Sequence, residues 1–405
     1  MIWQKSELSE VCRIGDGAHA SLKRTKLGIP YLTAKNITKS GIDYSKIDYI
    51  SEETYNKHFK NQSKALTQPQ KDDILYSIIG SIGGVHVVQN EKVGVSSSIA
   101  IFRANSDIIT PKYLAYFLRS TYFNAQVQAI KGGSAQGFIS LGKLASVEIS
   151  YPKDIKHQEK IVNILSLYDN LIDNSKKQIK LLEEAAQRLY KEWFVNLHFP
   201  GYEKVKIVNG LPEGWEYKSV SDFGEVITGK TPKTSKEEYY GGNIPFVTIP
   251  DMHGKVYPLT TGKYLTKTGA DSQKSKYLPQ NSVMVSCIAT VGLVNIAVEP
   301  CQTNQQINSV ILYDENDLYF FYESMSRIKA LLDGVGSNGA TMTNVNKTKF
   351  SNVKVLYPTE DLILKYNQFC KPLFDEILIL SKSVLMSERA RNSLLHKLMS
   401  GEIKV

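Results

Sequence analysis

The sequence predicts an α+β fold in which two similar mixed domains are joined by two long helices, with a pseudo-two-fold internal repeat. Two observations predict it. Sequence elements recur in the same order in both halves of the chain, and each half ends in a long heptad pattern. A chain of 405 residues is also too long for one ordinary core, which favours two or three folding units.

Four elements recur at similar spacings in the two halves. Trp3, Ser9 and Gly17 match Trp215, Ser221 and Gly229, each at an offset of 212 residues. The other matches are GIPYL at 28–32 with NIPFV at 243–247, DILYSIIGSIG at 73–83 with SVMVSCIATVG at 282–292, and KLASVEISYP at 143–152 with KFSNVKVLYP at 349–358. Each match is weak alone, but four in the same order indicate a duplicated domain.

Each half becomes helical after a Tyr-Pro pair, which is a usual helix boundary. The first helix is predicted over about residues 157–194, and it would be roughly 57 Å long at 1.5 Å per residue. Its seam runs through Ile161, Leu165, Tyr168, Ile172, Ser175, Ile179, Leu182, Ala186, Leu189 and Trp193. The second seam runs through Tyr366, Cys370, Leu373, Ile377, Leu380, Val384, Ser387, Arg391, Leu394 and Leu398.

Such seams favour pairing of the two helices as an antiparallel coiled coil. The alternative is that each helix packs only on its own domain. We expect a kink, or the start of a helix, at Pro372, because proline removes a backbone hydrogen bond.

Two mixed regions lie between these helices, with short apolar runs such as ILYSIIG and VMVSCIA that predict strands. Segments such as PKYLAYFLRSTYFNAQV predict helices. The predicted boundaries are 1–155 for the first domain, 156–198 for the central helix, 199–358 for the second domain and 359–405 for the C-terminal helix.

The composition favours a basic protein of the cytoplasm. The formal charge is +9 and the pI is near 9.0, which suits a nucleic-acid partner, although a solvated basic surface gives the same values. No apolar run approaches the eighteen or so residues that span a membrane, and the N-terminus lacks the apolar core of a signal peptide. The four cysteines show no C-x-x-C spacing and the seven histidines no H-E-x-x-H, so no metal or redox site is signalled.

A duplicated domain also suits DNA, because related modules can read half-sites that recur once per helical turn, about 34 Å. The segments KRTKLGIPYLTAKNITKSG (23–41) and TGKTPKTSKEEYYGG (228–242) combine lysines with hydroxyl and amide groups. Lysine and arginine contact phosphates, whereas amides and hydroxyls can read base edges. The alternative is that these segments are ordinary solvated loops.

With these features the chain resembles the specificity (S) subunits of type I restriction-modification systems. The resemblance covers essentially the whole chain and rests on the duplicated elements above together with TNQQI at 303–307, LLEEAAQRLYKEWF at 181–194 and LPEGWEYKSVSDFGEVITGKTP at 211–232. It implies two target recognition domains, each of which reads one half of a bipartite DNA site. It also implies that the helix pair fixes the length of the spacer between the halves.

The resemblance further implies partner subunits that carry the chemistry. Two modification subunits would dock on the helical regions and recognition domains, bring S-adenosylmethionine, and methylate the N6 of an adenine in each half-site. Restriction subunits would translocate and cleave unmodified DNA with ATP and Mg²⁺. The specificity subunit itself would be non-catalytic and bind no cofactor.

Three alternatives remain at the level of sequence. A nucleotide-binding enzyme is suggested by GEVITGKT at 224–231, which matches the P-loop pattern, although it lacks a preceding apolar strand and Pro232 follows at once. GVGSNG at 334–339 spells G-x-G-x-x-G, but it follows a predicted helix, not a strand. A nuclease would need clustered carboxylates, and Asp251, Glu216 and Lys218 lack the required order. A coiled-coil adaptor would not require two basic, loop-rich domains.

The candidate DNA contacts lie in the predicted loops, with basic residues as phosphate contacts and amides or hydroxyls as base readers. In the first domain they are Lys35, Asn36, Lys39, Ser81, Lys131, Ser134 and Gln136. In the second domain they are Lys230, Lys233, Thr234, Thr290, Asn304, Ser337 and Asn338. For Asn304 the alternative is that it satisfies buried backbone groups.

Overall fold

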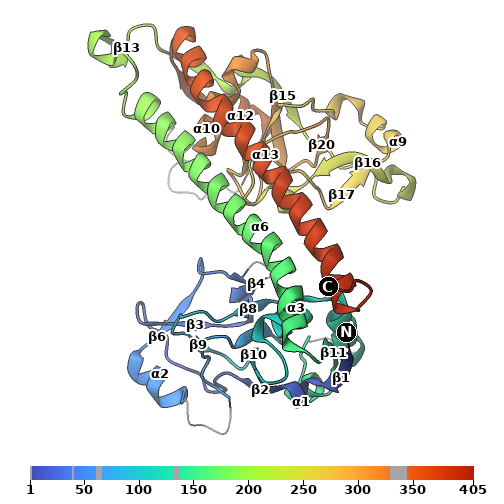
Figure 1. Ribbon diagram of the computed structural model, residues 1–405. Coiled ribbons are helices and arrows are strands. Elements are labelled where there is room, and N and C mark those ends of the chain that lie inside the picture. Colours follow the sequence, from blue (N-terminus) through green and yellow to red (C-terminus); the bar gives the residue numbers. More distant parts are fainter. Residues whose placement is uncertain (1, 39–40, 61–65, 132–136, 329–343) are drawn as a thin grey trace. The chain divides into compact units, whose positions relative to one another are not determined.

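The computed structural model describes residues 2–38, 41–60, 66–131, 137–328 and 344–405 (Figure 1). The chain forms two compact units. Unit 1 comprises Met1–Leu171 and Ser387–Val405, and unit 2 comprises Ile172–Met386. Each unit therefore combines one of the predicted mixed domains with a stretch of both long helices.

Unit 1 is built on a four-stranded antiparallel sheet in the order β2-β10-β7-β8. Its strands are β2 (Cys12–Asp16), β10 (Ile99–Ala104), β7 (Ile74–Ser77) and β8 (Val85–Val87). A second sheet has the order β6-β3-β9, from β6 (Asp48–Ile50), β3 (Ile29–Leu32) and β9 (Gly94–Val95). Two-stranded pairs join β1 (Trp3–Glu7) to β11 (Glu148–Pro152) and β4 (Ile37–Thr38) to β5 (Gly41–Ile42). The helices are α1 (Leu8–Val11), α2 (Glu52–His58), α3 (Pro111–Arg119), α4 (Thr121–Lys131) and α5 (Leu141–Ala145).

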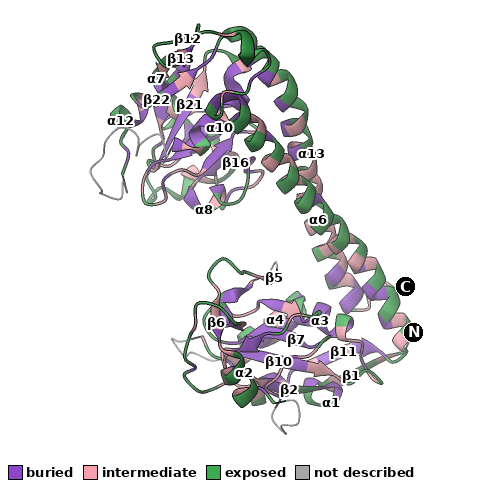
Figure 2. Ribbon diagram, turned by 90° about the vertical axis from the view of Figure 1, so that its left-hand side faces the viewer, coloured by how far each residue is buried: buried purple, intermediate pink, exposed green. Residues whose placement is uncertain are grey.

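Both faces of the four-stranded sheet in unit 1 are buried, because successive strand residues point to opposite faces. On one face, Tyr76 and Phe102 pack with Tyr113 and Phe117 of α3. On the other face, residues such as Leu75, Ile99 and Ile101 pack with Leu32 of β3 and Val95 of β9. Figure 2 shows the buried residues concentrated along these strands. This explains the unbroken apolar runs in the sequence.

Unit 2 repeats the four-stranded sheet, the three-stranded sheet and the β1–β11 pair of unit 1, whereas the β4–β5 pair has no counterpart among the described residues there. Its four-stranded sheet has the order β15-β21-β18-β19, from β15 (Gly224–Thr228), β21 (Ile307–Leu312), β18 (Val283–Ser286) and β19 (Val294–Ile296). The three-stranded sheet joins β17 (Lys263–Leu265), β16 (Tyr240–Val247) and β20 (Gln302–Thr303), and β14 (Glu216–Ser219) pairs with β22 (Lys354–Tyr357). The remaining elements are β12 (Ile207–Val208), β13 (Leu211–Pro212), α7 (Val220–Phe223), α8 (Ile249–Met252), α9 (Lys267–Asp271), α10 (Leu318–Ser326) and α12 (Lys347–Ser351). The predicted internal repeat is confirmed.

The two long helices are α6 (Ile155–Tyr190), which continues as a short π-helix at Lys191–Val195, and α13 (Glu360–Met399). All positions of the two predicted seams are buried or half-buried. In unit 1, Ile161 and Leu165 share a core with Leu395 and Leu398. In unit 2, Ala186, Tyr190 and Trp193 share a core with Tyr366 and Cys370. Stretches of both helices therefore contribute to the core of each unit.

Pro372 lies inside α13, so the alternative that a helix starts at Pro372 is wrong. The helix begins at Glu360, where Glu360 and Asp361 place negative charge in its first turn. Aromatic packing nearby contributes to the stability of this part of the helix, since Phe374 stacks on Tyr319 of α10 with ring centroids 4.5 Å apart.

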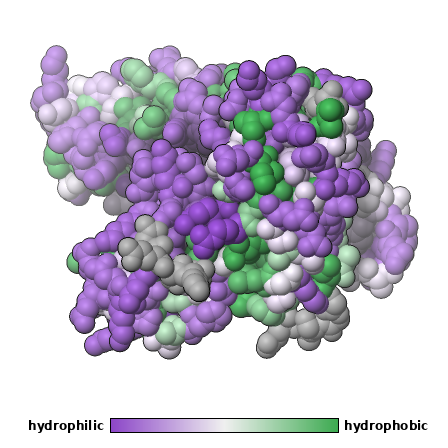
Figure 3. All heavy atoms as spheres, turned by 60° about the horizontal axis from the view of Figure 1, so that its bottom comes forward, coloured by the Kyte–Doolittle hydropathy of each residue, from purple (hydrophilic) through white to green (hydrophobic). Residues whose placement is uncertain are grey.

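On the face shown in Figure 3, hydrophilic residues cover most of the surface and hydrophobic residues form several smaller groups. Among the described helices, none is both long and apolar enough to cross a membrane.

Candidate nucleic-acid interface

Four loops of unit 1 lie side by side, and backbone hydrogen bonds link each loop to the next. Ala18 N donates to Val95 O at 2.8 Å and Ala18 O accepts from Ser97 N at 3.1 Å, which joins the loop at 17–18 to the end of β9 and to the loop at 96–98. Ile78 N donates to Ser98 O at 2.9 Å, and Ile139 N donates to Ile78 O at 3.1 Å. The segments 17–18, 96–98, 77–84 and 137–139 therefore form one connected series, which we call loop row 1.

Unit 2 contains the same series at the same places in its fold. Lys230 N donates to Thr303 O at 2.9 Å, Cys287 N donates to Gln306 O at 2.8 Å, and Val345 N donates to Cys287 O at 2.8 Å. The segments 229–230, 303–306, 286–293 and 344–345 form loop row 2. The duplication thus extends to individual hydrogen bonds of the loops.

The first segment of each row contains a glycine because its backbone lies very close to the backbone of the second segment. A Cβ atom on Gly17 would lie 1.9 Å from Val95 O, and one on Gly229 would lie 2.1 Å from Asn304 O. No side chain fits at such distances without displacing the neighbouring loop. The matched glycines of the sequence repeat therefore hold the first two segments of each row together.

The segments 77–84 and 286–293 are shaped by a serine that bonds within the loop. Ser77 Oγ donates to Ser81 O at 2.6 Å and accepts from Gly84 N at 2.8 Å. Ser286 Oγ accepts from Leu293 N at 2.8 Å in the equivalent position. Both loops are therefore anchored to the end of a central strand, and their exposed tips have defined positions.

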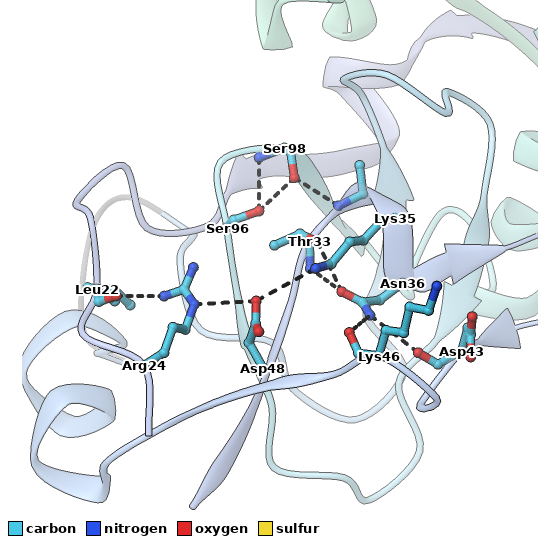
Figure 4. Close-up of polar contacts among 11 residues, drawn as sticks. Leu22, Arg24, Thr33, Lys35, Asn36, Asp43, Lys46, Asp48, Ser96 and Ser98 are labelled. Atoms are coloured by element: carbon cyan, nitrogen blue, oxygen red, sulfur yellow. Dashed lines mark hydrogen bonds and ion pairs between the residues drawn. The ribbon is translucent and has the colours of Figure 1, made fainter. Parts of the chain in front are cut away.

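A polar cluster beside loop row 1 is shown in Figure 4. Ala34 N donates to Ser98 Oγ at 2.9 Å, which ties this cluster to the row. The exposed Lys35 ammonium lies 3.8 Å from the Asp48 carboxylate, and Arg24 Nε lies 3.5 Å from the same group. The Arg24 guanidinium also covers the ring of Tyr31 at 4.1 Å. Two exposed cations are thus oriented next to the row, and Arg24 was missed among the sequence candidates although its KRTK segment was noted.

Asn36 has a structural role instead of the predicted contact with DNA. It is only 2% exposed, and its Oδ1 accepts from Thr33 N at 3.0 Å. Its Nδ2 donates to the carbonyls of Asp43 and Lys46, both at 3.3 Å. Both polar atoms of the amide are used inside the fold, so the side chain is not available to a base edge.

Asp251 takes the place of Asn36 in unit 2. Its carboxylate accepts from Thr248 N at 2.9 Å and from Thr248 Oγ1 at 2.7 Å, which completes the same capping box. Asp251 is one of the carboxylates that the nuclease alternative would need for a metal ion. Among the described residues, no cluster of three or more His, Cys, Asp or Glu side chains could hold a metal ion.

The remaining described candidates of the first domain lie at loop row 1. Ser81 is exposed at the tip of the 77–84 segment. Lys131 ends α4, and its Nζ lies 3.2 Å from the point that a Cβ atom on Gly137 would occupy. Lys39, Ser134 and Gln136 fall outside the described residues, as do Ser337 and Asn338 of the second domain.

In the second domain, Lys230, Thr290 and Asn304 lie within loop row 2, whereas Lys233 and Thr234 lie in the exposed segment that follows. Lys230 is exposed, while its backbone is held by Thr303 and by Gln273, whose Nε2 donates to Lys230 O at 2.6 Å. Asn304 uses its amide inside the loop, because Oδ1 accepts from Gln306 N and Nδ2 donates to Gln306 Oε1. This bonding favours the structural alternative for Asn304.

Gln305 is a further candidate that sequence reasoning missed. It is exposed at the centre of the 303–306 segment, and its Oε1 accepts from Thr231 Oγ1 at 2.7 Å. An exposed amide held by a neighbouring hydroxyl is suited to contact a base edge. The signal was the pair of glutamines in TNQQI.

The P-loop alternative does not fit the structure. Gly224–Thr228 is the strand β15, whose five residues pair with β21, so its backbone is not arranged around a phosphate. No helix opens after Lys230 and Thr231, and the Thr231 hydroxyl donates to Gln305 instead. Backbone N–H groups at a helix N-terminus are what a P-loop requires.

The four cysteines are buried and unpaired. Burial raises the pKa of Cys12, Cys301 and Cys370 to about 12 and that of Cys287 to about 11. Thiols with such pKa values stay protonated at neutral pH, so none of them is a ready nucleophile.

Comparison with known proteins gives matches over both halves. The family model described as type I restriction modification DNA specificity domain matches residues 2–184 and 212–362. The HindI type I restriction enzyme specificity subunit of Haemophilus influenzae is 30% identical over 82% of this chain and 87% of its own length. The MjaIX specificity subunit of Methanocaldococcus jannaschii is 24% identical over 100% of this chain and 94% of its own length.

A solved structure shows the same fold. The S subunit of a type I restriction-modification system from M. genitalium matches with a TM-score of 0.58 and 14% identity, over 98% of this chain and 96% of that chain. The predicted resemblance is confirmed by these matches.

Proposed function

We propose that this chain, which belongs to the type I restriction modification DNA specificity family, reads a two-part DNA site with one loop row for each half. The observation that carries the proposal is the repetition of the loop rows in the two units, with matching backbone hydrogen bonds between the loops. Repeated modules in one chain are suited to two half-sites that repeat along one duplex.

The charges and side chains of the loop rows support DNA as the ligand. Lys35, Lys131 and Lys230 place ammonium groups at or beside the rows, where they can neutralise phosphates. Ser81, Thr290 and Gln305 present hydroxyl and amide groups that can bond to base edges. Cations would supply most of the affinity, and the polar tips would supply the sequence preference.

The long helices offer surface for protein partners. In unit 2, a groove of about 410 Å³ on α6 is lined by Leu181, Glu184, Ala185, Arg188, Leu189 and Glu192. Leu181, Phe369 and Ile379 are 59–64% exposed on the two helices. Exposed apolar side chains bordered by charges are typical of protein interfaces. We propose that modification subunits dock on these helical surfaces while the loop rows hold DNA.

In the proposed complex, site selection and catalysis are carried out by different subunits. This chain would select the site and set the distance between its halves. The modification subunits would bring S-adenosylmethionine and methylate an adenine in each half, and restriction subunits would add ATP-dependent translocation and cleavage. The protein would act in the cytoplasm, where these partners and DNA meet.

The proposal is tested by mapping methylated adenines in DNA from cells that carry this chain and its modification subunit. We expect a two-part motif with a constant gap. Replacing residues 1–155 by those of a relative should change one half of the motif, and replacing residues 200–358 should change the other. A continuous motif, or a half that follows neither exchange, would contradict the proposal.

A further inference from the structure

Two apolar side chains are exposed together at the tip of loop row 1. Ile79 and Phe138 face each other across an isolated antiparallel bridge. Directly opposed residues of an antiparallel pair point to the same side, about 5 Å apart, so their side chains form one patch. Ile79 is 39% exposed and Phe138 is 50% exposed. We call this pair the apolar tip.

The apolar tip is held in place by the backbone around it. Gly80 N donates to Gly137 O at 3.0 Å, and Ile139 N donates to Ile78 O at 3.1 Å, so bonds flank the bridge on both sides. Gly80 and Gly83 adopt positive φ values of 71° and 105°, which shape the turn between Ile79 and the returning strand. Two exposed apolar groups are therefore presented on a turn that is held by backbone hydrogen bonds on both sides of the bridge.

A cation lies directly beside the apolar tip. Lys131 Nζ approaches to 3.2 Å from the Cβ position of Gly137, the residue before Phe138. Next to the turn, Asn124 Oδ1 lies 3.7 Å from the Cβ position of Gly83. This arrangement suits a nucleotide as the ligand. The apolar pair can contact the base, while the ammonium group can contact the charged phosphate beside it.

The equivalent bridge in unit 2 has a different character. It joins Ile288 to Asn344, so an exposed amide replaces Phe138. Ile288 is half-buried, and Ala289 follows it with a φ of 64°, as Gly80 follows Ile79. The backbone is retained while the side chains differ, which is the behaviour expected of positions that distinguish one half-site from the other.

We propose that Ile79 and Phe138 contact the C5-methyl group of a thymine in the half-site read by unit 1. The methyl group is the apolar feature that base pairs present in the major groove, and it separates thymine from the other bases there. Lys131 would hold the neighbouring phosphate and thereby fix the register of the contact. This inference rests on the proposed function, because it assigns one base class to one loop row.

The test is a scan with deoxyuridine, which lacks only the methyl group. The protein bound to its modification subunit is titrated with duplexes of its mapped motif in which each thymine in turn is replaced by deoxyuridine. We expect one replacement to weaken binding about fourfold or more, the effect of one buried methyl group. In Phe138→Ala that same replacement should have a much smaller effect, because only Ile79 is left to contact the methyl group.

Two further variants separate the contact from general effects on folding. Ile2→Ala truncates another exposed apolar side chain, beside the β1–β11 pair, and should leave the deoxyuridine sensitivity unchanged. Phe138→Leu keeps an apolar group and should retain more of the sensitivity than Phe138→Ala, whereas Phe138→Asn, with the residue type of the unit 2 bridge, should retain no more than Phe138→Ala does.

The outcomes distinguish the inference from the proposed function. A complex that binds a two-part motif but is insensitive to deoxyuridine overturns the inference alone. Sensitivity that persists undiminished in Phe138→Ala also overturns it. A Phe138→Ala chain that binds DNA as before but no longer binds its modification subunit would show a protein contact instead. A complex with no two-part motif overturns the proposed function itself.

Discussion

Arg391 of α13 donates a hydrogen bond to Asp169 of α6 at 2.6 Å inside unit 1. The second oxygen of Asp169 accepts from the Tyr116 hydroxyl of α3 at 2.6 Å, and Arg119 lies 3.8 Å away. One carboxylate therefore joins the domain of unit 1 to both long helices. The group is about three-quarters buried, so solvent screens it less than a surface pair.

Removing the arginine should destabilise unit 1. We expect Arg391→Met to lower the free energy of unfolding by about 1–2 kcal/mol, because a hydrogen bond to a charged group is lost while the stem of the side chain is kept. The midpoint of urea unfolding measures this. Lys371→Met is a suitable control, since Lys371 and Asp375 form an exposed pair four residues apart that is worth under about 0.5 kcal/mol. Equal shifts in the two variants would contradict the special role of Asp169.

Gly80 in unit 1 and Ala289 in unit 2 occupy equivalent turns. We expect glycine-to-alanine and alanine-to-glycine substitutions at these turns to have opposite effects on stability. Both have positive φ, at 71° and 64°. Gly80→Ala should destabilise unit 1 by about 1 kcal/mol from backbone strain alone, because nothing lies within 4 Å of the added Cβ. Ala289→Gly should relieve a similar strain in unit 2. Gly142→Ala in α5 is the matched control and should not destabilise, since that position is helical and equally open. Thermal unfolding of the three variants checks this.

Lys230 is expected to act as a phosphate contact. Its backbone is fixed by Thr303 and Gln273, so Lys230→Ala should leave the loop unchanged while it removes the side chain with its charge. Binding to DNA of any sequence should weaken, and the slope of log K against log salt should fall by about 0.9. Lys131→Ala should behave in the same way.

Fluorescence anisotropy at several salt concentrations measures these slopes. Lys204→Ala, an exposed lysine in the short helix Tyr202–Lys204, is the control and should leave the slope unchanged. A loss of preference at one base position, with no change of slope, would make Lys230 a base reader instead.

Glu323 should make unit 2 less stable as the pH rises. It is 3% exposed in α10, and burial raises its pKa to about 8, opposed by Arg327 and assisted by Glu183. The folded state therefore favours the protonated carboxyl, while the unfolded chain loses that proton from about 4.5. The contribution of this group to stability is fully present below pH 4.5, and it is lost as the pH rises through about 8. Glu323→Gln should remove this loss, which is on the order of a few kcal/mol by pH 9.

Urea unfolding at pH 5 and pH 9 checks this prediction. The wild type and Glu323→Gln should differ little at pH 5, and the variant should be the more stable at pH 9. Glu376→Gln changes an exposed carboxylate of α13 and should follow the wild type at both pH values. A variant that is less stable than the wild type at pH 9 would show that the carboxylate is stabilised in a way the burial does not indicate.

Leu181 should contribute to docking of the modification subunit. It is 64% exposed at the groove on α6, so Leu181→Asp should weaken association about tenfold or more without unfolding unit 2. Lys177→Asp introduces the same residue at another exposed position of α6 and should have a much smaller effect. Titration calorimetry with the purified modification subunit distinguishes the two variants.

Much of the fold could be predicted because it depends on patterns of residue types over short stretches of the sequence. The order of matched elements predicted the repeat, and the heptad seams predicted both long helices and their buried faces. The candidate site was predicted less well. Loop composition pointed to Lys35, Ser81 and Lys230, which are exposed, but it could not separate them from Asn36, whose amide is used inside the fold. Composition reports which groups a loop contains and does not report which of them are already bonded.

The sequence by itself determined the repeat, the helical seams and the segments that become loops, since each depends on residue types at short, regular spacings. Only the tertiary structure decided the partners of individual side chains. Asp169 and Arg391 are 222 residues apart, and only the fold places the Asp169 carboxylate beside this charged position of the second seam. Ile79 and Phe138 lie in distant segments of the chain, and only a bridge between those segments brings the two exposed side chains together. The periodicity of the sequence specifies on which face of a helix or strand a residue lies. Contacts between distant segments specify which side chains pack against that face.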